Sequence, residues 1–345
     1  MTPSPALQIG VFGAGRIGYR HARTVANEVI GARLAAICDV HLESAQTLAE
    51  LTGCERYTAD PADILEDPSI GAVIIGSSTD SHAPLIEAAA AAGKQIFCEK
   101  PIALDLETTD RAIAAAKSAG VQLQIGFQRR FDKAYAKASQ LIADGKLGNI
   151  EVVRDTMRDP NPPHEAYIPT SGGLFRDMVI HDFDCVRWLM GCEPVEVYAM
   201  GANLVDPVFA KYGDIDTCTV NIRFESGALG AIDASRRSGF GYDVRTEIFG
   251  SESAVMIGEG RDTPLYRYDS EGVWSDHIFW FLERFDDAYV AEIRAFVNCI
   301  RQDTPVTITG ADGRAALAMA YAAEASIREN APVPMSRFAT EGTSP

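Results

Sequence analysis

A glycine-rich turn near the start of the chain constrains the fold more than any other feature. Gly13, Gly15 and Gly18 follow the apolar segment 7–12 and open a segment with helical periodicity, and a second apolar segment ends at Asp39. A strand, a G-x-G-x-x-G turn, a helix and then an acid about twenty residues on are typical of a dinucleotide-binding βαβ unit. The alternative is a glycine-rich turn that binds no ligand.

Each part of this turn has a physical role in binding a dinucleotide. Gly13 allows the tight turn, Gly15 lets the backbone approach a pyrophosphate, and Gly18 lets the helix pack close to the strand. The helix N-terminus supplies free N–H groups and a partial positive charge. A carboxylate at Asp39 accepts hydrogen bonds from ribose hydroxyls and repels a 2′-phosphate, so we expect NAD rather than NADP. The expected cofactor contacts here are Gly13, Gly15, Arg16, Ile17, Gly18 and Asp39.

The first third of the chain alternates strand-like and helix-like segments. The predicted strands cover residues 7–12, 34–39, 71–76, 95–98 and 121–126. The predicted helices cover residues 17–29, 42–51, 82–92 and 106–119. Nearly continuous apolar strands joined by helices indicate a parallel sheet that is covered on both faces. Ligands of such sheets bind beyond the carboxyl ends of the strands.

The pattern changes beyond residue 148, where a period of two appears. Alternate residues from Cys218 to Phe224 are apolar, and Thr217, Thr219 and Asn221 lie on the opposite, polar face. This alternation is typical of a sheet with one buried face. Further strands are predicted over 229–235, 242–249 and 254–257, and helices over 288–301 and 313–329. The pattern predicts a mixed, largely antiparallel sheet backed by helices.

Two domains follow from these patterns. We expect an α/β Rossmann domain that binds NAD over residues 1–126. An α+β domain that binds substrate and mediates oligomerisation is expected over residues 127–339, with a loose tail over 340–345. A chain of 345 residues is long enough for two domains of ordinary size.

Composition excludes several classes of partner. The chain has 31 Lys and Arg against 48 Asp and Glu, a net charge of −17, so it should repel nucleic acid and anionic membranes. It shows neither a secretory signal nor an apolar run of transmembrane length. Seven scattered cysteines without a C-x-x-C pair indicate free thiols in a reducing cytoplasm. The dispersed histidines, with no H-x-x-x-H pair, predict no metal site.

Lys100 lies in the segment Cys98-Glu99-Lys100-Pro101, at the carboxyl end of the predicted strand 95–98. The reactive ring of a bound cofactor should lie at this edge of the sheet. A lysine there can donate to a substrate hydroxyl and stabilise a developing alkoxide. The alternative is a solvated lysine in a surface loop.

Asp177 and His181 are four residues apart, which on a helix places both side chains on one face. A carboxylate beside an imidazole orients the ring and favours its protonated form, so His181 is a candidate proton acceptor in the oxidation of an alcohol. The alternative is a pair bound only to each other, or a capping acid. Polar loops at 158–164 and 240–242 suit a polyhydroxylated ligand or are ordinary surface loops.

Together these motifs resemble the glucose–fructose oxidoreductase, inositol dehydrogenase and rhizopine catabolism (Gfo/Idh/MocA) family over about residues 7–335. Within the family the chain is most similar to inositol dehydrogenases. The residues that carry the resemblance are Gly13-Ala14-Gly15-Arg16-Ile17-Gly18, Asp39, Glu99-Lys100-Pro101, Gly126-Phe127-Gln128-Arg129-Arg130-Phe131-Asp132, Asp177 with His181, and Arg284-Phe285-Asp286-Asp287-Ala288-Tyr289.

The resemblance implies that Lys100, Asp177 and His181 form a catalytic triad around one carbinol. His181 would take the hydroxyl proton, Asp177 would orient His181, and Lys100 would bind the same oxygen while hydride passes to the nicotinamide. The implied reaction is NAD-dependent oxidation of a ring hydroxyl of a cyclic polyol or sugar, such as myo-inositol or scyllo-inositol to the inosose. The further implied cofactor contacts are Ser77, Ser78, Thr79, His82, Glu99, Lys100 and Gln128. The implied substrate contacts are Lys100, Arg129, Asp159, Asp177, His181, Tyr242 and Tyr289.

Alternatives stay open at this point. One is an aldose 1-dehydrogenase or another sugar oxidoreductase of the family, including one that keeps its cofactor and exchanges hydride between two sugars. Another is a non-catalytic NAD-binding sensor. Phe240 and Asp159 stand where the family pattern has tyrosine and asparagine, which leaves the ring stereochemistry open. The family commonly forms tetramers through the open face of the second sheet, so a homotetramer is expected.

Overall fold

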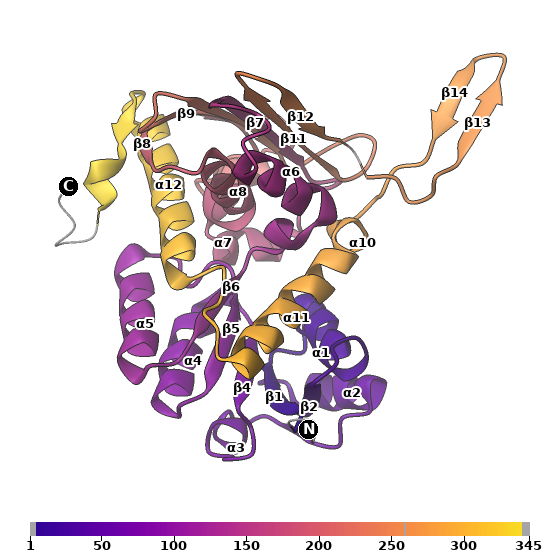
Figure 1. The fold of residues 1–345 in the computed structure, drawn as a ribbon, viewed down its shortest axis with the longest axis vertical. Helices are drawn as coiled ribbons and strands as arrows, with labels where there is room; N and C mark the ends of the chain where they lie inside the picture. The colour runs from indigo at the N-terminus through magenta and orange to yellow at the C-terminus, as the bar shows by residue number, and fades with distance from the viewer. Residues whose placement is uncertain (1–4, 259, 340–345) are drawn as a thin grey trace. The chain divides into compact units, whose positions relative to one another are not determined.

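The computed structural model describes residues 5–258 and 260–339 and contains two compact units (Figure 1). The units comprise Met1–Phe131 with Asp287–Ala315, and Asp132–Asp286 with Ala316–Pro345. The segment 287–315 therefore groups with the N-terminal half, although the sequence analysis assigns it to the second domain. The expected tail at 340–345 lies outside the described residues.

Within the described residues, the first unit is built on a six-stranded parallel sheet in the order β3-β2-β1-β4-β5-β6. The strands are β1 (Leu7–Phe12), β2 (Ala32–Cys38), β3 (Tyr57–Thr58), β4 (Ala72–Ile75), β5 (Gln95–Glu99) and β6 (Leu123–Gly126). This is the strand order of the Rossmann fold. The order in which strands are added to the sheet reverses between β1 and β4, and ligands of this fold bind at that point. The predicted parallel sheet is confirmed.

Helices connect these strands and cover the sheet. They are α1 (Arg16–Asn27), α2 (Leu42–Thr52), α3 (Ala62–Leu65), α4 (Thr79–Ala91) and α5 (Leu106–Ala119). Figure 1 shows α4 and α5 side by side. The Asp105 carboxylate accepts from the Thr108 N–H at 2.7 Å to cap α5, and Gly120 ends the helix in the left-handed region.

Helix α11 (Asp286–Gln302) completes the core of the first unit from far along the chain. Its apolar residues Ile293, Phe296 and Val297 are buried in one cluster with residues of α1, α2 and the sheet. The Phe296 ring lies edge-on to Phe97 of β5, with ring centroids 6.0 Å apart. A helix whose apolar face is buried against the first sheet cannot belong to the second core, which explains why segment 287–315 groups with the N-terminal half.

The second unit is built, in the residues described, on a seven-stranded sheet in the order β12-β11-β7-β10-β9-β8-β15. The strands are β7 (Ile150–Arg158), β8 (Pro194–Ala202), β9 (Thr217–Phe224), β10 (Leu229–Ser235), β11 (Asp243–Gly250), β12 (Ala254–Ile257) and β15 (Val333–Pro334). Strands β7 and β10 pair in parallel, and the other described pairs are antiparallel. The predicted mixed, largely antiparallel sheet is confirmed.

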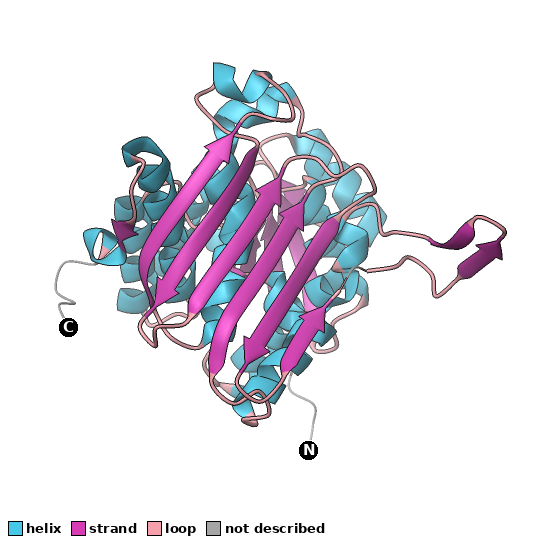
Figure 2. Ribbon diagram, turned by 90° about the horizontal axis from the view of Figure 1, so that it is seen from above, coloured by secondary structure: helices cyan, strands magenta, loops and turns pink. Residues whose placement is uncertain are grey.

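One face of this sheet is backed by helices, including α6 (Lys133–Ala143) and α8 (Ile180–Met190). Its other face is open, as Figure 2 shows. In β9 the residues Cys218, Val220, Ile222 and Phe224 are buried, and the polar residues that alternate with them are half-buried or exposed. The period of two in the sequence therefore gave the correct buried face.

Further helices, most of them short, join the main elements. They are α7 (Ile168–Ser171), α9 (Val208–Lys211), α10 (Phe281–Arg284) and the long α12 (Gly310–Glu329). The carboxylate of Asp312 accepts from the N–H of Thr309 at 2.8 Å at the start of α12. Among the described helices, none combines the length and the apolar composition that a bilayer crossing requires.

A two-stranded hairpin of β13 (Tyr266–Asp269) and β14 (Gly272–Ser275) stands apart from the seven-stranded sheet (Figures 1 and 2). All eight of its strand residues are exposed. The sequence analysis did not predict this hairpin, because its strands bury no face and so lack the apolar alternation that reveals the others.

Truncation of Phe296 to alanine tests whether α11 is part of the first core. Because the ring is fully buried among core side chains, Phe296→Ala is expected to lower the free energy of unfolding by about 3–5 kcal/mol. Chemical denaturation followed by circular dichroism measures this change. The exposed Asn298 on the same helix is the control, and Asn298→Ala should change stability by less than about 0.5 kcal/mol. Equal effects of the two variants would contradict the assignment.

Candidate active site

Three glycines bring backbone segments into close contact just beyond the carboxyl ends of β1 and β4. Gly13 has φ +99°, and a Cβ added to it would lie 2.6 Å from the carbonyl oxygen of Gly76. A Cβ on Gly18 would lie 2.0 Å from the carbonyl oxygen of Gly13. Backbone atoms cannot move aside as a flexible side chain can, so α1 approaches β1 closely only with glycine at these positions. Gly76, after β4, is a partner that the sequence analysis did not single out.

Gly15 differs from these glycines because the space around it is open. Within the described residues, no heavy atom lies within 4 Å of a Cβ placed on Gly15. It is the N-cap of α1, with φ −72° and ψ −170°, and no described side chain caps this helix end. The exposed Arg16 and half-buried Ile17 begin the helix. Uncapped N–H groups beside open space fit a pyrophosphate.

Asp39 directly follows β2 and is fixed beside the turn. Its Oδ2 accepts from the N–H of Ala14 at 2.7 Å, and its Oδ1 accepts from the N–H of His41 at 2.8 Å. Each oxygen keeps a second lone pair, so the carboxylate can still accept from a ribose diol. The next side chain, Val40, is 82% exposed. The turn and this acid together fit the adenosine half of NAD.

The loop after β4 carries Ser77, Ser78, Thr79 and His82. The Ser77 and Ser81 hydroxyls lie 2.6 Å apart, and Ser78 is the N-cap of α4, whose first residue is Thr79. His82 is buried, with Nδ1 at 2.8 Å from the carbonyl oxygen of Pro101 and Nε2 at 3.2 Å from that of Ser77.

Burial lowers the pKa of His82, so the ring is neutral at pH 7. Its nitrogens face two backbone carbonyls, one in the loop after β4 and one in the turn that contains Lys100. A neutral ring has one N–H, so it donates to one of these two carbonyls at a time, and the Pro101 carbonyl oxygen is the nearer. The sequence predicts a cofactor contact at His82, and that prediction is not tested by these contacts.

Lys100 is half-buried and follows β5 directly. Its neighbour Glu99 is buried and binds Nε2 of His21 through Oε1 at 2.7 Å. A Cβ on Gly126, at the end of β6, would lie 3.0 Å from the Glu99 carboxyl group. Gln128 and Arg129 follow in a 3₁₀ turn (Gln128–Phe131), and both are buried. The predicted residues after β5 and β6 therefore share one edge of the sheet.

In the second unit, the segment with Asp177 and His181 is not a continuous α-helix. Asp177 lies in a π-helical turn (η3, Phe175–Val179), and His181 lies in the following helix α8, where it is buried. A π turn is wider than an α turn. The expected α-helix is therefore corrected at Asp177, which lies in the π turn, whereas His181 lies in an α-helix.

Asp177 is held by a buried arginine that the sequence analysis missed. Nη2 of Arg236 donates to Oδ2 of Asp177 at 2.9 Å, and the Tyr167 hydroxyl donates to Oδ1 at 2.9 Å. Nη1 of Arg236 lies 3.7 Å from Oδ2 of Asp159. Burial disfavours the charged guanidinium, but Asp177 and Asp159 outweigh it and raise the pKa of Arg236. One cation thus balances two predicted site acids.

Parallel pairing explains why Asp159 and Arg236 meet. Asp159 follows β7 and Arg236 follows β10, and in this parallel pair Arg158 lies opposite Ser235. The N–H of Asp159 donates to the carbonyl oxygen of Ser235 at 3.0 Å, which extends the ladder by one bond. In the sequence, the only sign that Asp159 and Arg236 meet is that each charged residue directly follows a strand. It was not decisive, because the sequence does not tell which strands pair in parallel.

The three aromatic residues considered for the substrate pocket lie in different surroundings. Tyr242 is buried, with its ring edge-on to Phe285 at 6.3 Å between centroids, and Phe240 is 46% exposed. Tyr289 belongs to the first unit, is buried, and lies edge-on to His21 at 6.0 Å. Burial leaves Tyr242 and Tyr289 little surface for a ligand in this structure.

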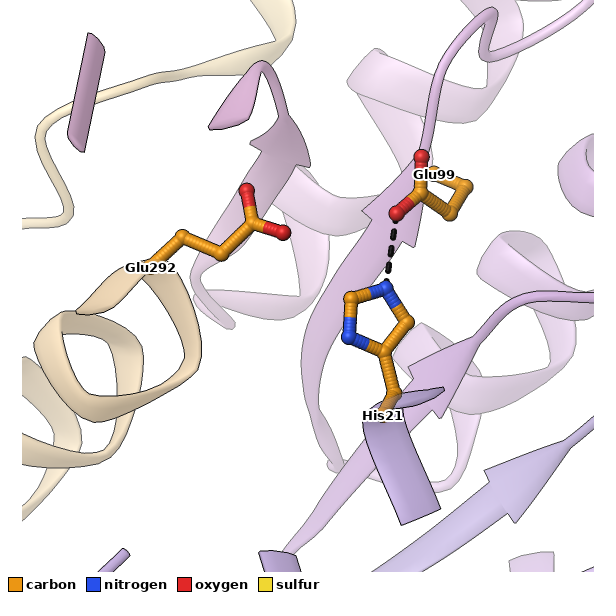
Figure 3. A group of neighbouring side chains, drawn as sticks. All are labelled: His21, Glu99 and Glu292. Carbon is orange, nitrogen blue, oxygen red and sulfur yellow. Dashed lines mark hydrogen bonds and ion pairs between the residues drawn. The ribbon is translucent and has the colours of Figure 1, made fainter. Parts of the chain in front are cut away.

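Tertiary structure also gathers a group that the sequence did not suggest. His21, Glu99 and Glu292 come from α1, β5 and α11 (Figure 3). A ring nitrogen of His21 and a carboxylate oxygen of each glutamate lie within 4.8 Å of one another. The separation of these residues along the chain explains why a search for short histidine motifs did not find them.

The fold, the glycine turn and Asp39 define an NAD-binding oxidoreductase of the Rossmann class. The oxidoreductase family with an NAD-binding Rossmann fold matches residues 7–127, and the GFO/IDH/MocA C-terminal domain matches residues 135–256. The chain belongs to the GFO/IDH/MocA oxidoreductase family. The family resemblance stated from the sequence is therefore confirmed.

Relatives match nearly the whole chain. A myo-inositol 2-dehydrogenase of Thermotoga maritima is 43% identical, over 94% of this chain and 97% of that protein. A scyllo-inositol 2-dehydrogenase (NAD(+)) of Bacillus subtilis is 39% identical, over 95% and 96%. The crystal structure of a scyllo-inositol dehydrogenase from Lactobacillus casei with bound NAD(H) and scyllo-inositol has a TM-score of 0.89 and 34% identity, over 96% of this chain and 99% of that one.

Replacing Arg236 with methionine tests how much its charge stabilises the folded protein through Asp159 and Asp177. Arg236→Met leaves Asp159 and Asp177 without their buried counter-charge, so the free energy of unfolding should fall by about 3 kcal/mol. Urea denaturation at pH 7 measures the loss. The exposed neighbour Arg237 provides the control, and Arg237→Met should change stability by less than about 0.5 kcal/mol. A neutral Arg236→Met result would show that the guanidinium does not stabilise these acids.

Proposed function

We propose that this protein catalyses the NAD-dependent oxidation of a ring hydroxyl of an inositol, myo-inositol or scyllo-inositol, to the corresponding inosose. One observation carries the proposal: relatives named for inositol oxidation match both units along nearly the entire chain. Lys100, Asp177 and His181 are all present in this chain, which favours a working dehydrogenase over a sensor that only binds NAD.

The first unit fits NAD through its own residues. The uncapped start of α1 at Gly15 would bind the pyrophosphate, and the fixed carboxylate of Asp39 would bind the adenosine ribose. When bound, the cofactor supplies the hydride acceptor for the carbinol carbon. The remaining contacts proposed for it are Arg16, Ile17, Ser77, Ser78, Thr79, Glu99, Lys100 and Gln128.

We propose three roles for the catalytic residues. The imidazole of His181 accepts the proton of the substrate hydroxyl as the C–H bond gives up its hydride. The ammonium group of Lys100 donates to the same oxygen and stabilises the negative charge that develops there. Asp177 orients the imidazole and stabilises it once it is protonated. The alcohol thus loses a hydride and a proton and leaves as a ketone.

Arg236 gives this arrangement a support. Because Arg236 and the Tyr167 hydroxyl already bind Asp177, the carboxylate is held in one orientation without a substrate. Arg236 also faces Asp159, which we propose as an acceptor for a neighbouring ring hydroxyl. Arg129, Tyr242 and Tyr289 are proposed as further substrate contacts, from the family resemblance.

We further propose a cytoplasmic homotetramer. All seven cysteines, each within the described ranges, are free thiols, which suits a reducing compartment. The open face of the second sheet exposes Met200, Leu229, Phe249 and Met256 among ion pairs such as Arg154 with Glu247. A face that mixes exposed apolar side chains with ion pairs suits a contact between copies of the chain.

A substrate screen with two variants tests the proposed reaction. Wild-type protein should form NADH, read by its absorbance, with myo-inositol or scyllo-inositol. Lys100→Met and His181→Ala should each lower kcat by about 100-fold or more, because each removes a group that acts on the reacting oxygen. The Kd for NAD, measured by calorimetry, should change by less than about threefold in His181→Ala, because His181 is not among the proposed cofactor contacts.

Each other outcome of this screen has a definite meaning. Turnover of aldoses but not inositols would replace the substrate assignment with that of an aldose dehydrogenase. NAD binding without turnover of any polyol would favour the sensor. If Lys100→Met and His181→Ala keep the wild-type rate, the catalytic roles proposed for Lys100 and His181 are wrong. Nicotinamide released from the purified, denatured protein would favour an enzyme that keeps its cofactor.

Cofactor preference tests the role of Asp39. The double substitution Asp39→Ser with Val40→Arg removes the carboxylate that repels a 2′-phosphate and adds a cation at an exposed position. The ratio of kcat/KM for NADP to that for NAD should rise on the order of tenfold or more. Steady-state kinetics with both cofactors measures it, and an unchanged ratio would contradict the assignment of Asp39 to the ribose.

A further inference from the structure

Three ionisable side chains are buried together inside the first unit. His21 and Glu292 are fully buried, and Glu99 is 7% exposed. They come from α1, α11 and β5, and Figure 3 shows the Glu292 carboxyl group directed toward the other two. We call these three residues the buried triad.

The carboxyl group of Glu292 is buried without a hydrogen-bond partner among the residues that the structure describes. Among the described residues, neither Oε1 nor Oε2 of Glu292 has a partner, and the same holds for Nδ1 of His21. An ionised carboxylate without donors is very costly to bury. Two carboxylates that share a dry site cannot both be ionised unless a cation lies between them.

The hydrogen bond between His21 and Glu99 requires one proton between Nε2 and Oε1. Nε2 of His21 lies 2.7 Å from Oε1 of Glu99, so a proton on Nε2 donates to an ionised Glu99. Nδ1 is then a buried acceptor, and a protonated Glu292 is a buried donor in the same cluster. If His21 and Glu292 are both neutral and Glu99 is ionised, the cluster has one buried donor, the Glu292 hydroxyl, and one buried acceptor, Nδ1 of His21.

Two uncharged side chains, Tyr289 and Gln124, also lie near the buried triad. Tyr289 lies three residues earlier on α11, and its ring packs against His21. Gln124 of β6 donates through Nε2 to the backbone carbonyl oxygen of Glu292 at 3.2 Å, and not to its carboxyl group. Burial first, and then repulsion by Glu99, raise the pKa of Glu292 well above its ordinary value.

We propose that Glu292 is a positioning residue of the dehydrogenase, which holds a proton at neutral pH and so keeps Glu99 as the one anion of the buried triad. Glu99 connects three elements, because it binds His21 of α1, packs against Gly126 of β6 and precedes Lys100. A second negative charge at Glu292 would repel Glu99 and disturb the turn that carries Lys100. The positioning role rests on the function proposed for Lys100; the charge state does not.

The variant Glu292→Gln tests the charge state, because it keeps the shape and cannot ionise. In wild-type protein the acid stays protonated when folded, but titrates near 4.5 when unfolded. Its contribution to stability is therefore complete below pH 4.5 and is lost as the pH rises toward the raised pKa of the folded state. The unfolding constant of wild type, relative to that of Glu292→Gln, should rise up to about tenfold per pH unit between pH 5 and 8.

A matched control and two independent readouts complete this test. Glu50→Gln removes an exposed carboxyl group on α2 and should follow the wild-type pH dependence. The infrared spectrum of wild-type protein at pH 7 should show a protonated carboxyl stretch that Glu292→Gln lacks. Because ionised Glu292 would disturb the Lys100 turn, kcat of wild type should fall at alkaline pH. Glu292→Gln should lack this fall, with the KM for the polyol unchanged.

Opposite results would overturn the proposal. These are parallel pH dependences for wild type and Glu292→Gln, or no protonated carboxyl stretch in wild type. One equivalent of divalent metal in purified wild-type protein would also overturn it, because the triad would then be a cation site with both acids ionised. Infrared and metal analysis of wild type need no variant and no turnover, so they decide the charge state even if no polyol is oxidised. An unchanged kcat profile alone would overturn the positioning role.

Discussion

The close backbone contact of Gly13, Gly18 and Gly76 is the constraint on which the first unit depends. It brings α1 against β1 at the point where the sheet reverses its strand order. The uncapped helix end then faces open space at Gly15, where partial positive charge is useful. The same helix carries His21 inward to Glu99, so one backbone contact sets both the cofactor turn and the packing beneath Lys100.

The second unit depends on a different device, which is one parallel strand pair in a sheet whose other described pairs are antiparallel. The carboxyl ends of β7 and β10 meet, and this places Asp159 beside Arg236. Arg236 then reaches Asp177 in the π-helical turn. A buried guanidinium beside two carboxylates balances acids that would otherwise repel one another and holds them in place.

Both units therefore solve the problem of buried charge, and they do so in opposite ways. Arg236 is an arginine kept charged by two acids. In the buried triad, none of the described residues hydrogen-bonds the Glu292 carboxyl group, and burial and then repulsion by Glu99 raise its pKa and favour the neutral form. The difference follows from what each side chain meets, because a carboxyl group can gain a proton to escape burial of its charge, whereas a guanidinium cannot lose one near neutral pH.

The sequence by itself determined the parallel first sheet, the one-sided second sheet and the glycine turn with Asp39. Each is encoded by local periodicity or by residues close along the chain. Only tertiary structure decided that α11 completes the first core, that β7 pairs in parallel with β10, and that Asp177 lies in a π turn. It also decided that Arg236 balances two acids and that His21 meets Glu99 and Glu292. These features join segments far apart in sequence, and their energies depend on burial and on which strands are neighbours, which no local pattern specifies.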